Sequence, residues 1–259
     1  EMSDKATIPI KTRTLTMDLK PSSAEKYKAL QESQCLNSIV FDDDNVKDEK
    51  MSLDAMILSG KLAQLSNGFV YVDEALRITP EILQKASTTG DIKSLLKDTK
   101  KKVAVDIFDD REKAMLKLVK YIHRKHGQVP IAIPYYHKHE LVQLQRILPT
   151  GVCDTEPDFQ ERWNRKEISY LFLQYSRSSK SLNLQRGGNI MAFYCPTFKW
   201  VDDYQIIRRL ARQGQPEKRV YAYRLYMRGT IDDIKTKKLN ERFKGHSRFQ
   251  KQILKQIRS

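Results

Sequence analysis

The sequence predicts an α/β fold in which a parallel β-sheet is flanked by helices and preceded by an N-terminal helical extension. The first observation is a pattern: from Lys102 onward, short apolar runs alternate with amphipathic segments, which is typical of βαβ units. The second is composition. The 259 residues are 40% hydrophobic and 31% charged, which suffices for one large domain or two small ones with a buried core.

The strands and helices of this sheet are predicted from the spacing of apolar residues. Apolar runs predict strands at Val103–Ile107, Val129–Ile133, Tyr170–Gln174, Asn189–Tyr194 and Arg219–Tyr226. Periodic segments between them predict helices at Arg111–Lys125, Lys138–Ile147, Asp158–Asn164 and Val201–Arg212. A final basic amphipathic helix is expected from Thr230 towards the C-terminus.

Residues 1–101 are expected to form an N-terminal strand and helical part, and residues 102–259 the sheet domain that ends in the basic helix. Ala6–Leu19 indicates an extended segment, followed by a helix from Pro21 to Leu30. An acidic, aperiodic stretch near residues 41–50 predicts a loop. A helical pattern returns at Leu53–Leu65 and ends at the turn pair Asn67-Gly68.

The charge of the chain favours a polyanionic partner. The formal net charge is +15, and residues 200–259 carry 16 Lys and Arg against 6 Asp and Glu. Nucleic acid or nucleotide phosphates would suit such a surface, although a solvated lysine-rich helix has the same composition.

Several classes of protein are disfavoured by what the sequence lacks. The three cysteines are far apart and neither they nor the histidines have metal-ligand spacing, so we expect a reducing compartment and no metal site. No run approaches the roughly 18 apolar residues of a membrane helix, and the first residues do not form an apolar signal core. We therefore expect a cytoplasmic protein without a membrane partner.

Two arginines are candidates for phosphate binding. Arg209 and Arg212 are three residues apart in the predicted helix and would share one face. A guanidinium binds two phosphate oxygens at once and stays charged, so this pair suits phosphate, although a solvated basic face would have the same spacing. Ligands of open parallel sheets bind beyond the carboxyl ends of the strands, where we expect these arginines and the segment Ser176–Gln185 to lie.

Gln205 to Gln215 resembles motif VI of the Swi/Snf-like superfamily-two helicases, which reads Gln-x-x-x-Arg-x-x-Arg-x-Gly-Gln. Ser178 to Gln185, followed by Gly187 to Ile190, resembles motif V of phage-type members. The family continues with a strand and Gly-Thr-Ile-Asp, as do Val220–Met227 and Gly229–Asp232. Weaker similarities are at Ile131–Leu141, Phe159–Asn164 and Gln64–Gly68. Together they cover roughly residues 6 to 258.

This resemblance implies a second RecA-like ATPase lobe with assigned residues. Arg212 would be the arginine finger on the γ-phosphate of ATP, with Arg209 as its companion. Gln205, Gly214 and Gln215 would belong to the ATP site and the interface between lobes. The DNA contacts would be Ser178, Ser179, Lys180, Asn183 and Arg186.

The motifs that are missing imply a partner. The sequence has no complete phosphate-binding loop and no carboxylate pair closing an apolar strand for Mg²⁺. By the resemblance, the chain would be one half of an ATP-dependent DNA helicase or translocase. ATP and Mg²⁺ would be shared with a first lobe in cis or in trans, in the host cytoplasm if the protein is phage-encoded, and this chain alone would be inactive.

A second hypothesis remains open. Ser181 stands where the family usually has glycine, which suits a backbone that needs positive φ or close approach to a ligand. The chain would then be a stand-alone, non-catalytic nucleic-acid-binding or adaptor protein with a helicase-lobe fold.

Overall fold

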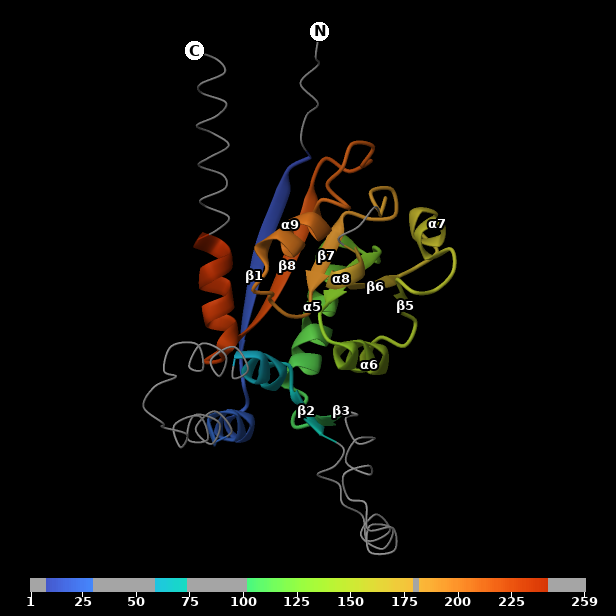
Figure 1. Cartoon of the computed structure of the whole chain (residues 1–259). Coiled ribbons are helices and arrows are strands. Elements are labelled where there is room, and N and C mark those ends of the chain that lie inside the picture. The colour runs from blue at the N-terminus through green and yellow to red at the C-terminus, as the bar shows by residue number, and fades with distance from the viewer. Residues whose placement is uncertain (1–7, 30–58, 74–101, 179–181, 242–259) are drawn as a thin grey trace, which may run out of the picture. The chain divides into compact units, whose positions relative to one another are not determined.

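The computed structural model describes residues 8–29, 59–73, 102–178 and 182–241 (Figure 1). The expected acidic loop near residues 41–50, Ser179, Lys180, Ser181 and the end of the basic helix lie outside the described residues. The chain divides into two compact units. One joins Glu1–Ala24 to Asp110–Ser259, and the other comprises Glu25–Asp109.

The first unit is built on a six-stranded sheet in the order β1-β8-β7-β4-β6-β5, in which every neighbouring pair is parallel. The strands are β1 (Ile10–Asp18), β4 (Ile131–Tyr135), β5 (Val152–Cys153), β6 (Tyr170–Gln174), β7 (Ile190–Phe193) and β8 (Val220–Arg228). The predicted α/β fold with a helix-flanked parallel sheet is confirmed. The extended N-terminal segment supplies the edge strand β1, whose Ile10 pairs with Val220.

Five labelled helices accompany the sheet: α5 (Asp110–His126), α6 (Lys138–Ile147), α7 (Phe159–Asn164), α8 (Tyr175–Ser178) and α9 (Trp200–Ile207). Residues 21–29 and 231–241 are also helical. No helix of the described segments is long and apolar enough to cross a membrane.

The sheet separates two apolar cores, because successive side chains of a strand point to opposite faces. On one face, Ile131 and Ile133 pack in a cluster with Met115 and Leu118 of α5. On the other, Leu171 and Leu173 cluster with Trp163 of α7 and with Ile206 and Leu210 around the end of α9. The helices therefore form two layers, with α5 and α6 on one side and α7 and α9 on the other.

The apolar run at Val103–Ile107 was expected to join the parallel sheet, and this prediction is wrong. The run forms β3 (Lys102–Asp106), which pairs antiparallel with β2 (Phe69–Asp73) in the second unit. Its residues are half-buried or exposed, whereas all five residues of β4 are buried. A half-buried surface suits a two-stranded ribbon rather than a sheet covered on both faces.

The expected turn at Asn67-Gly68 is present and leads into β2. Gly68 has φ of +87°, and a β-carbon there would lie 2.1 Å from the carbonyl oxygen of Phe108, so this position requires glycine. The carbonyl of Gly68 accepts hydrogen bonds from the N–H groups of Ile107 (2.7 Å) and Phe108 (3.1 Å). These bonds close the ribbon at the end of β3.

The predicted helix Val201–Arg212 ends earlier than expected. Helix α9 stops at Ile207, and residues 208–214 form turns and bends, so Arg209 and Arg212 do not lie on a helix. Leu210, within these turns, is buried in the same core as Ile206 and Ile207. The amide of Gln215 then donates to the carbonyl of Leu210 at 3.0 Å, supplying a hydrogen bond that a longer helix would have supplied from its backbone.

Candidate functional site

The two segments that resemble motifs V and VI meet through their side chains. Arg212 is exposed, and its guanidinium donates hydrogen bonds to Oδ1 of Asn183 at 2.5 Å and to the carbonyl of Leu182 at 3.4 Å. Positions 29 residues apart in the sequence thus form one site. The hydrogen bond to Asn183 holds the Arg212 guanidinium in place. The guanidinium has five N–H donors, so others stay available to an anion.

Arg209 lies close enough to Arg212 for the two charges to interact. Its side chain is half-buried, and burial followed by repulsion from Arg212 lowers the pKa of Arg209 from its ordinary value. The two guanidiniums are near each other although the helix that was expected to align them has ended. An anion placed against both would relieve their repulsion, so the residues present fit a phosphate group.

Gln215 is buried and braces the turn rather than projecting from it. Its Nε2 donates to the carbonyls of Gly188 and Leu210, each at 3.0 Å, and its Oε1 accepts the N–H of Glu217 at 3.2 Å. Gly214 beside it is exposed and has φ of +90°. Gln205, on α9, is exposed.

Helix α7 fixes the backbone of the segment that carries Asn183. Oε1 of Gln160 accepts the N–H of Asn183 at 3.0 Å, and Nδ2 of Asn164 donates to the carbonyl of Asn183 at 2.8 Å. Oδ1 of Asn164 accepts the N–H of Arg186 at 3.2 Å, and the buried indole of Trp163 donates to the carbonyl of Leu184 at 2.9 Å. The sequence predicts a helix here but assigns none of these side chains.

The site lies at the amino ends of β7 and β8, and the expectation of the carboxyl edge is wrong for it. The carbonyl of Gly188, just before β7, accepts from Gln215. Nδ2 of Asn189 donates to the carbonyl of Arg219, the residue before β8, at 3.1 Å. A helix that connects parallel strands runs antiparallel to them. Its end, and the arginines that follow it, therefore reach the opposite edge.

The three described candidate DNA contacts, Ser178, Asn183 and Arg186, are spread along the chain between β6 and β7. Ser178 ends α8, which directly follows the carboxyl end of β6. Asn183 bonds Arg212 near the amino edge, and the exposed Arg186 lies close by in sequence. Ser179 and Lys180 fall outside the described residues. Residues 175–178 therefore lie at the carboxyl edge of the sheet, and residues 182–188 lead to the amino edge.

A buried ion pair anchors the helix that leads to the arginines. Arg224 of β8 donates to both carboxylate oxygens of Asp203 on α9, at 2.7 and 2.5 Å, and lies over the ring of Phe193. Burial opposes the charge on Arg224, but the Asp203 carboxylate outweighs it and raises the pKa of Arg224. This bidentate pair fixes α9 on the sheet.

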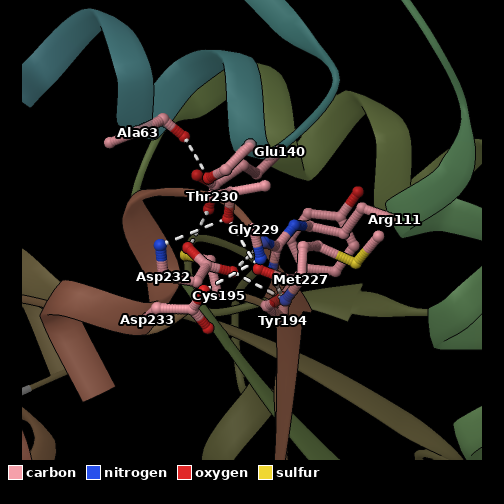
Figure 2. A network of polar contacts seen from close by, with 11 residues as sticks. Ala63, Arg111, Glu140, Tyr194, Cys195, Met227, Gly229, Thr230, Asp232 and Asp233 are labelled. Atoms are coloured by element: carbon pink, nitrogen blue, oxygen red, sulfur yellow. Dashed lines mark hydrogen bonds and ion pairs between the residues drawn. The ribbon is translucent and has the colours of Figure 1, made fainter. Parts of the chain in front are cut away.

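A second buried network joins the end of β8 to α5 (Figure 2). The guanidinium of Arg111 pairs with Asp232 and donates to the carbonyl of Tyr194 at 2.7 Å. Asp232 also accepts the N–H of Met227 at 3.1 Å, while Thr230 donates to the carbonyl of Met227 at 2.7 Å. The Gly229–Asp232 tetrapeptide therefore has a structural role, tying three segments together.

The cysteines and acidic groups of the described segments do not form a metal centre. No group of three or more His, Cys, Asp or Glu side chains there could hold an ion. Cys195 is buried and donates to Oε2 of Glu140 at 3.3 Å, and burial raises the pKa of its thiol. A thiol in this state is a poor nucleophile and a poor ligand.

Comparison with known proteins places the fold. No protein-family model matches the chain. Putative protein p41 of Acyrthosiphon pisum secondary endosymbiont phage 1 is 28% identical over 134 residues, which are 50% of this chain and 29% of that protein. The C-terminal part of the Fun30 ATPase domain superposes with a TM-score of 0.57 and 14% identity, covering 90% of both chains.

The chain has the fold of a Snf2 ATPase C-terminal lobe. A second solved structure agrees: the SWI2/SNF2 ATPase core of Sulfolobus solfataricus in complex with double-stranded DNA has a TM-score of 0.52 and 13% identity. The alignment covers 86% of this chain and 42% of that one, so the Snf2-lobe fold accounts for part of a longer ATPase core there. In this Snf2-lobe fold, Arg212 and Asn183 occupy the amino edge of the sheet.

Proposed function

We propose that this chain is the second lobe of an ATP-dependent DNA translocase or helicase of the Swi/Snf-like, phage-type class, a nucleotide-binding hydrolase that needs a first lobe. The observation that carries the proposal is the hydrogen bond of Arg212 to Asn183, with Arg209 beside it, in a Snf2-lobe fold. The exposed guanidinium of Arg212 at one edge of the sheet is available to a nucleotide held by another module. The partial match to a phage protein supports the phage-type assignment.

Arg212 is the arginine finger in this proposal. ATP with Mg²⁺ would supply a terminal phosphoryl group on which negative charge develops during transfer. The Arg212 guanidinium offers its remaining donors to that charge, and Arg209 adds a second positive group. Such a finger is worth about 10³ to 10⁵ in rate. The ligands of Mg²⁺ and the phosphate-binding loop would come from the first lobe, in cis or in trans.

The segment from α8 to β7 is the proposed link between nucleotide and DNA. Ser178, with Ser179, Lys180 and Arg186, would contact the phosphate backbone without reading sequence. Asn183, in the same segment, touches Arg212. A change at the arginines on ATP binding or release would therefore pass directly into a DNA-contacting segment.

The test is reconstitution of ATPase activity from this chain, a matching first lobe and duplex DNA. We expect the Arg212→Ala variant to lose about 10³-fold in turnover while DNA binding by the isolated chain is retained. The matched control is Arg165→Ala, which removes another exposed arginine, one paired with Glu167 on the surface. Unchanged turnover in Arg212→Ala would refute the finger. DNA binding by the isolated chain, with no ATPase activity beside any first lobe, would instead support the non-catalytic adaptor.

A further inference from the structure

The exposed face of α5 carries a row of positive side chains with no acidic residue among them. Lys113, Lys117, Lys120 and Arg124 are exposed, and the sequence from 113 to 126 contains no Asp or Glu. With 3.6 residues per turn, these four side chains fall within about 60° of the helix circumference and span about 16 Å along its axis. We call them the α5 basic row.

Solvated helices usually pair their lysines with carboxylates three or four residues away, but Lys117, Lys120 and Arg124 have no Asp or Glu at that spacing. Within the part of the chain that the structure describes, Lys117, Lys120 and Arg124 have neither an ion pair nor a hydrogen-bonding partner. Burial, followed by repulsion from Lys125 and Arg13, lowers the pKa of nearby His126. The positive field at this end of α5 is therefore not neutralised locally.

The row borders a hollow of about 320 Å³ between α5 and the end of β1. Lys20, Lys113, Lys117 and Lys120 line it, and its apolar floor includes Met17, Ala114 and Leu116. The two carboxylates that also line the hollow already have partners. Asp110 accepts the N–H of Lys20 at 3.2 Å and the hydroxyl of Ser23, and Asp18 pairs with Arg228 at 3.4 Å.

We propose that the α5 basic row is a binding surface for the phosphate backbone of duplex nucleic acid, separate from the site at Arg212. Its cations recur about every 4.5 to 6 Å along the helix, and DNA offers a phosphate about every 3.4 Å along each strand. Contacts to phosphate oxygens carry no base information, so the proposed binding is independent of sequence.

The features of the row favour nucleic acid over a membrane or an acidic protein. Interfacial membrane binding needs exposed apolar anchors, and protein interfaces are dominated by aromatic and arginine hot spots. The exposed large hydrophobic residues of the described segments are Tyr136, Val142, Phe198, Val201 and Ile234, and none is on α5. A polyphosphate backbone requires only cations.

This inference does not rest on the proposed function. Helix α5 covers the face of the sheet opposite to α7 and α9, and the two apolar cores are formed by different residues. The row would bind a duplex even if the chain never took part in ATP hydrolysis. Failure of the arginine finger would leave the surface intact, and failure of the surface would leave the finger untouched.

The test is binding of the full chain to a duplex of about 20 base pairs with random sequence. Binding is measured by fluorescence anisotropy at salt concentrations between roughly 50 and 200 mM. For Lys117→Ala/Lys120→Ala we expect about tenfold weaker binding at roughly 100 mM salt. The slope of log K against log salt should fall in magnitude by about 1.8, or 0.9 for each lost phosphate contact. Alanine favours helix, so the variant should fold.

Two controls make the result specific. Lys26→Ala/Lys102→Ala removes the same charge from exposed positions elsewhere and should keep the wild-type slope. In a second readout, duplex should protect Lys117 and Lys120, but not Lys26 and Lys102, from an amine-acetylating reagent. An unchanged slope without protection overturns the proposal. The proposal is also overturned if the Lys117→Ala/Lys120→Ala variant loses binding to phosphatidylserine vesicles or polyglutamate while its binding to DNA is unchanged.

Discussion

The guanidinium of Arg212 is held by Asn183, a residue whose own backbone is held by another helix. The hydrogen bond from Arg212 to Oδ1 of Asn183 measures 2.5 Å. The N–H and carbonyl of Asn183 are bonded to Gln160 and Asn164 of α7. Two layers of contacts therefore set the direction of the arginine before any ligand arrives, which is the preorganisation that a charge-stabilising group requires.

Asn183 should act on catalysis through Arg212. In the reconstituted ATPase we expect Asn183→Ala to lower kcat about tenfold, or about 1.4 kcal/mol, with little change in KM, because the arginine loses its fixed direction. In an Arg212→Ala background the same substitution should have almost no further effect, since the group it positions is gone. Additive losses in the double variant would show that Asn183 acts independently of Arg212.

Gly187 should be intolerant of a side chain. A β-carbon there would lie 2.2 Å from the carbonyl oxygen of Trp163 and 2.4 Å from its indole. Gly187→Ala therefore forces α7 away from the segment that carries Asn183. We expect a loss of about 1 to 3 kcal/mol in the free energy of unfolding, measured by urea denaturation with far-ultraviolet circular dichroism. Gly60→Ala is the control. Its β-carbon meets nothing within 4 Å in a helical segment, so that variant should be neutral or slightly more stable. Equal effects of the two would refute the clash.

The parts of the fold that the sequence predicts well are those fixed by local pattern. Tyr170–Gln174 and Lys138–Ile147 match β6 and α6 residue for residue, because each apolar pattern is bounded by polar or turn residues. Val103–Ile107 has an equally apolar pattern but joins a different sheet. Which strand a run pairs with depends on tertiary contacts, and those are not encoded in its own periodicity.

The site is harder to predict because it depends on where segments end and which way they run. Leu210 continues the helical spacing of α9, yet the helix ends at Ile207, and the side chain of Gln215 donates to the carbonyl of Leu210 from five residues away. A helix that connects two parallel strands runs antiparallel to them, and this rule can be applied from the sequence alone. It predicts that Arg212, after the end of α9, lies at the amino edge of the sheet. The side chains of Trp163 and Asn164 form hydrogen bonds with the backbone of residues 183–186, about 20 residues away in the sequence. No local sequence pattern specifies such contacts.

The Asp203–Arg224 pair should be costly to break on one side only. Asp203→Asn leaves the buried guanidinium of Arg224 without its counter-charge, and we expect a loss of about 3 to 5 kcal/mol in the free energy of unfolding by urea denaturation. The control is Asp202→Asn, at the neighbouring half-exposed position in the same first helical turn, where the loss should stay below about 1 kcal/mol. Similar losses at the two positions would mean that the buried ion pair contributes no more to the free energy of unfolding than a partly exposed carboxylate.

The free energy of unfolding should fall as the pH is lowered through about 6.5, the ordinary pKa of histidine, because of the partly buried His126. Burial lowers the pKa of His126, with Lys125 and Arg13 adding to the effect, so the fold disfavours its charged form. In the unfolded chain the pKa is about 6.5. Below that value the unfolded state binds more protons than the folded state, and the free energy of unfolding decreases until the folded pKa is passed.

His126→Gln should therefore lose less stability than the wild type between pH 7.5 and 5.5, measured by urea denaturation at each pH, because glutamine cannot take up the proton. Tyr223→Phe separates burial from hydrogen bonding, since Nε2 of His126 lies 2.5 Å from the Tyr223 hydroxyl. Burial is the leading cause of the shift, so the phenylalanine variant should keep the wild-type pH dependence even if it is less stable throughout. If instead the pH dependence disappears in Tyr223→Phe and persists in His126→Gln, the shift at His126 does not govern acid sensitivity in this range.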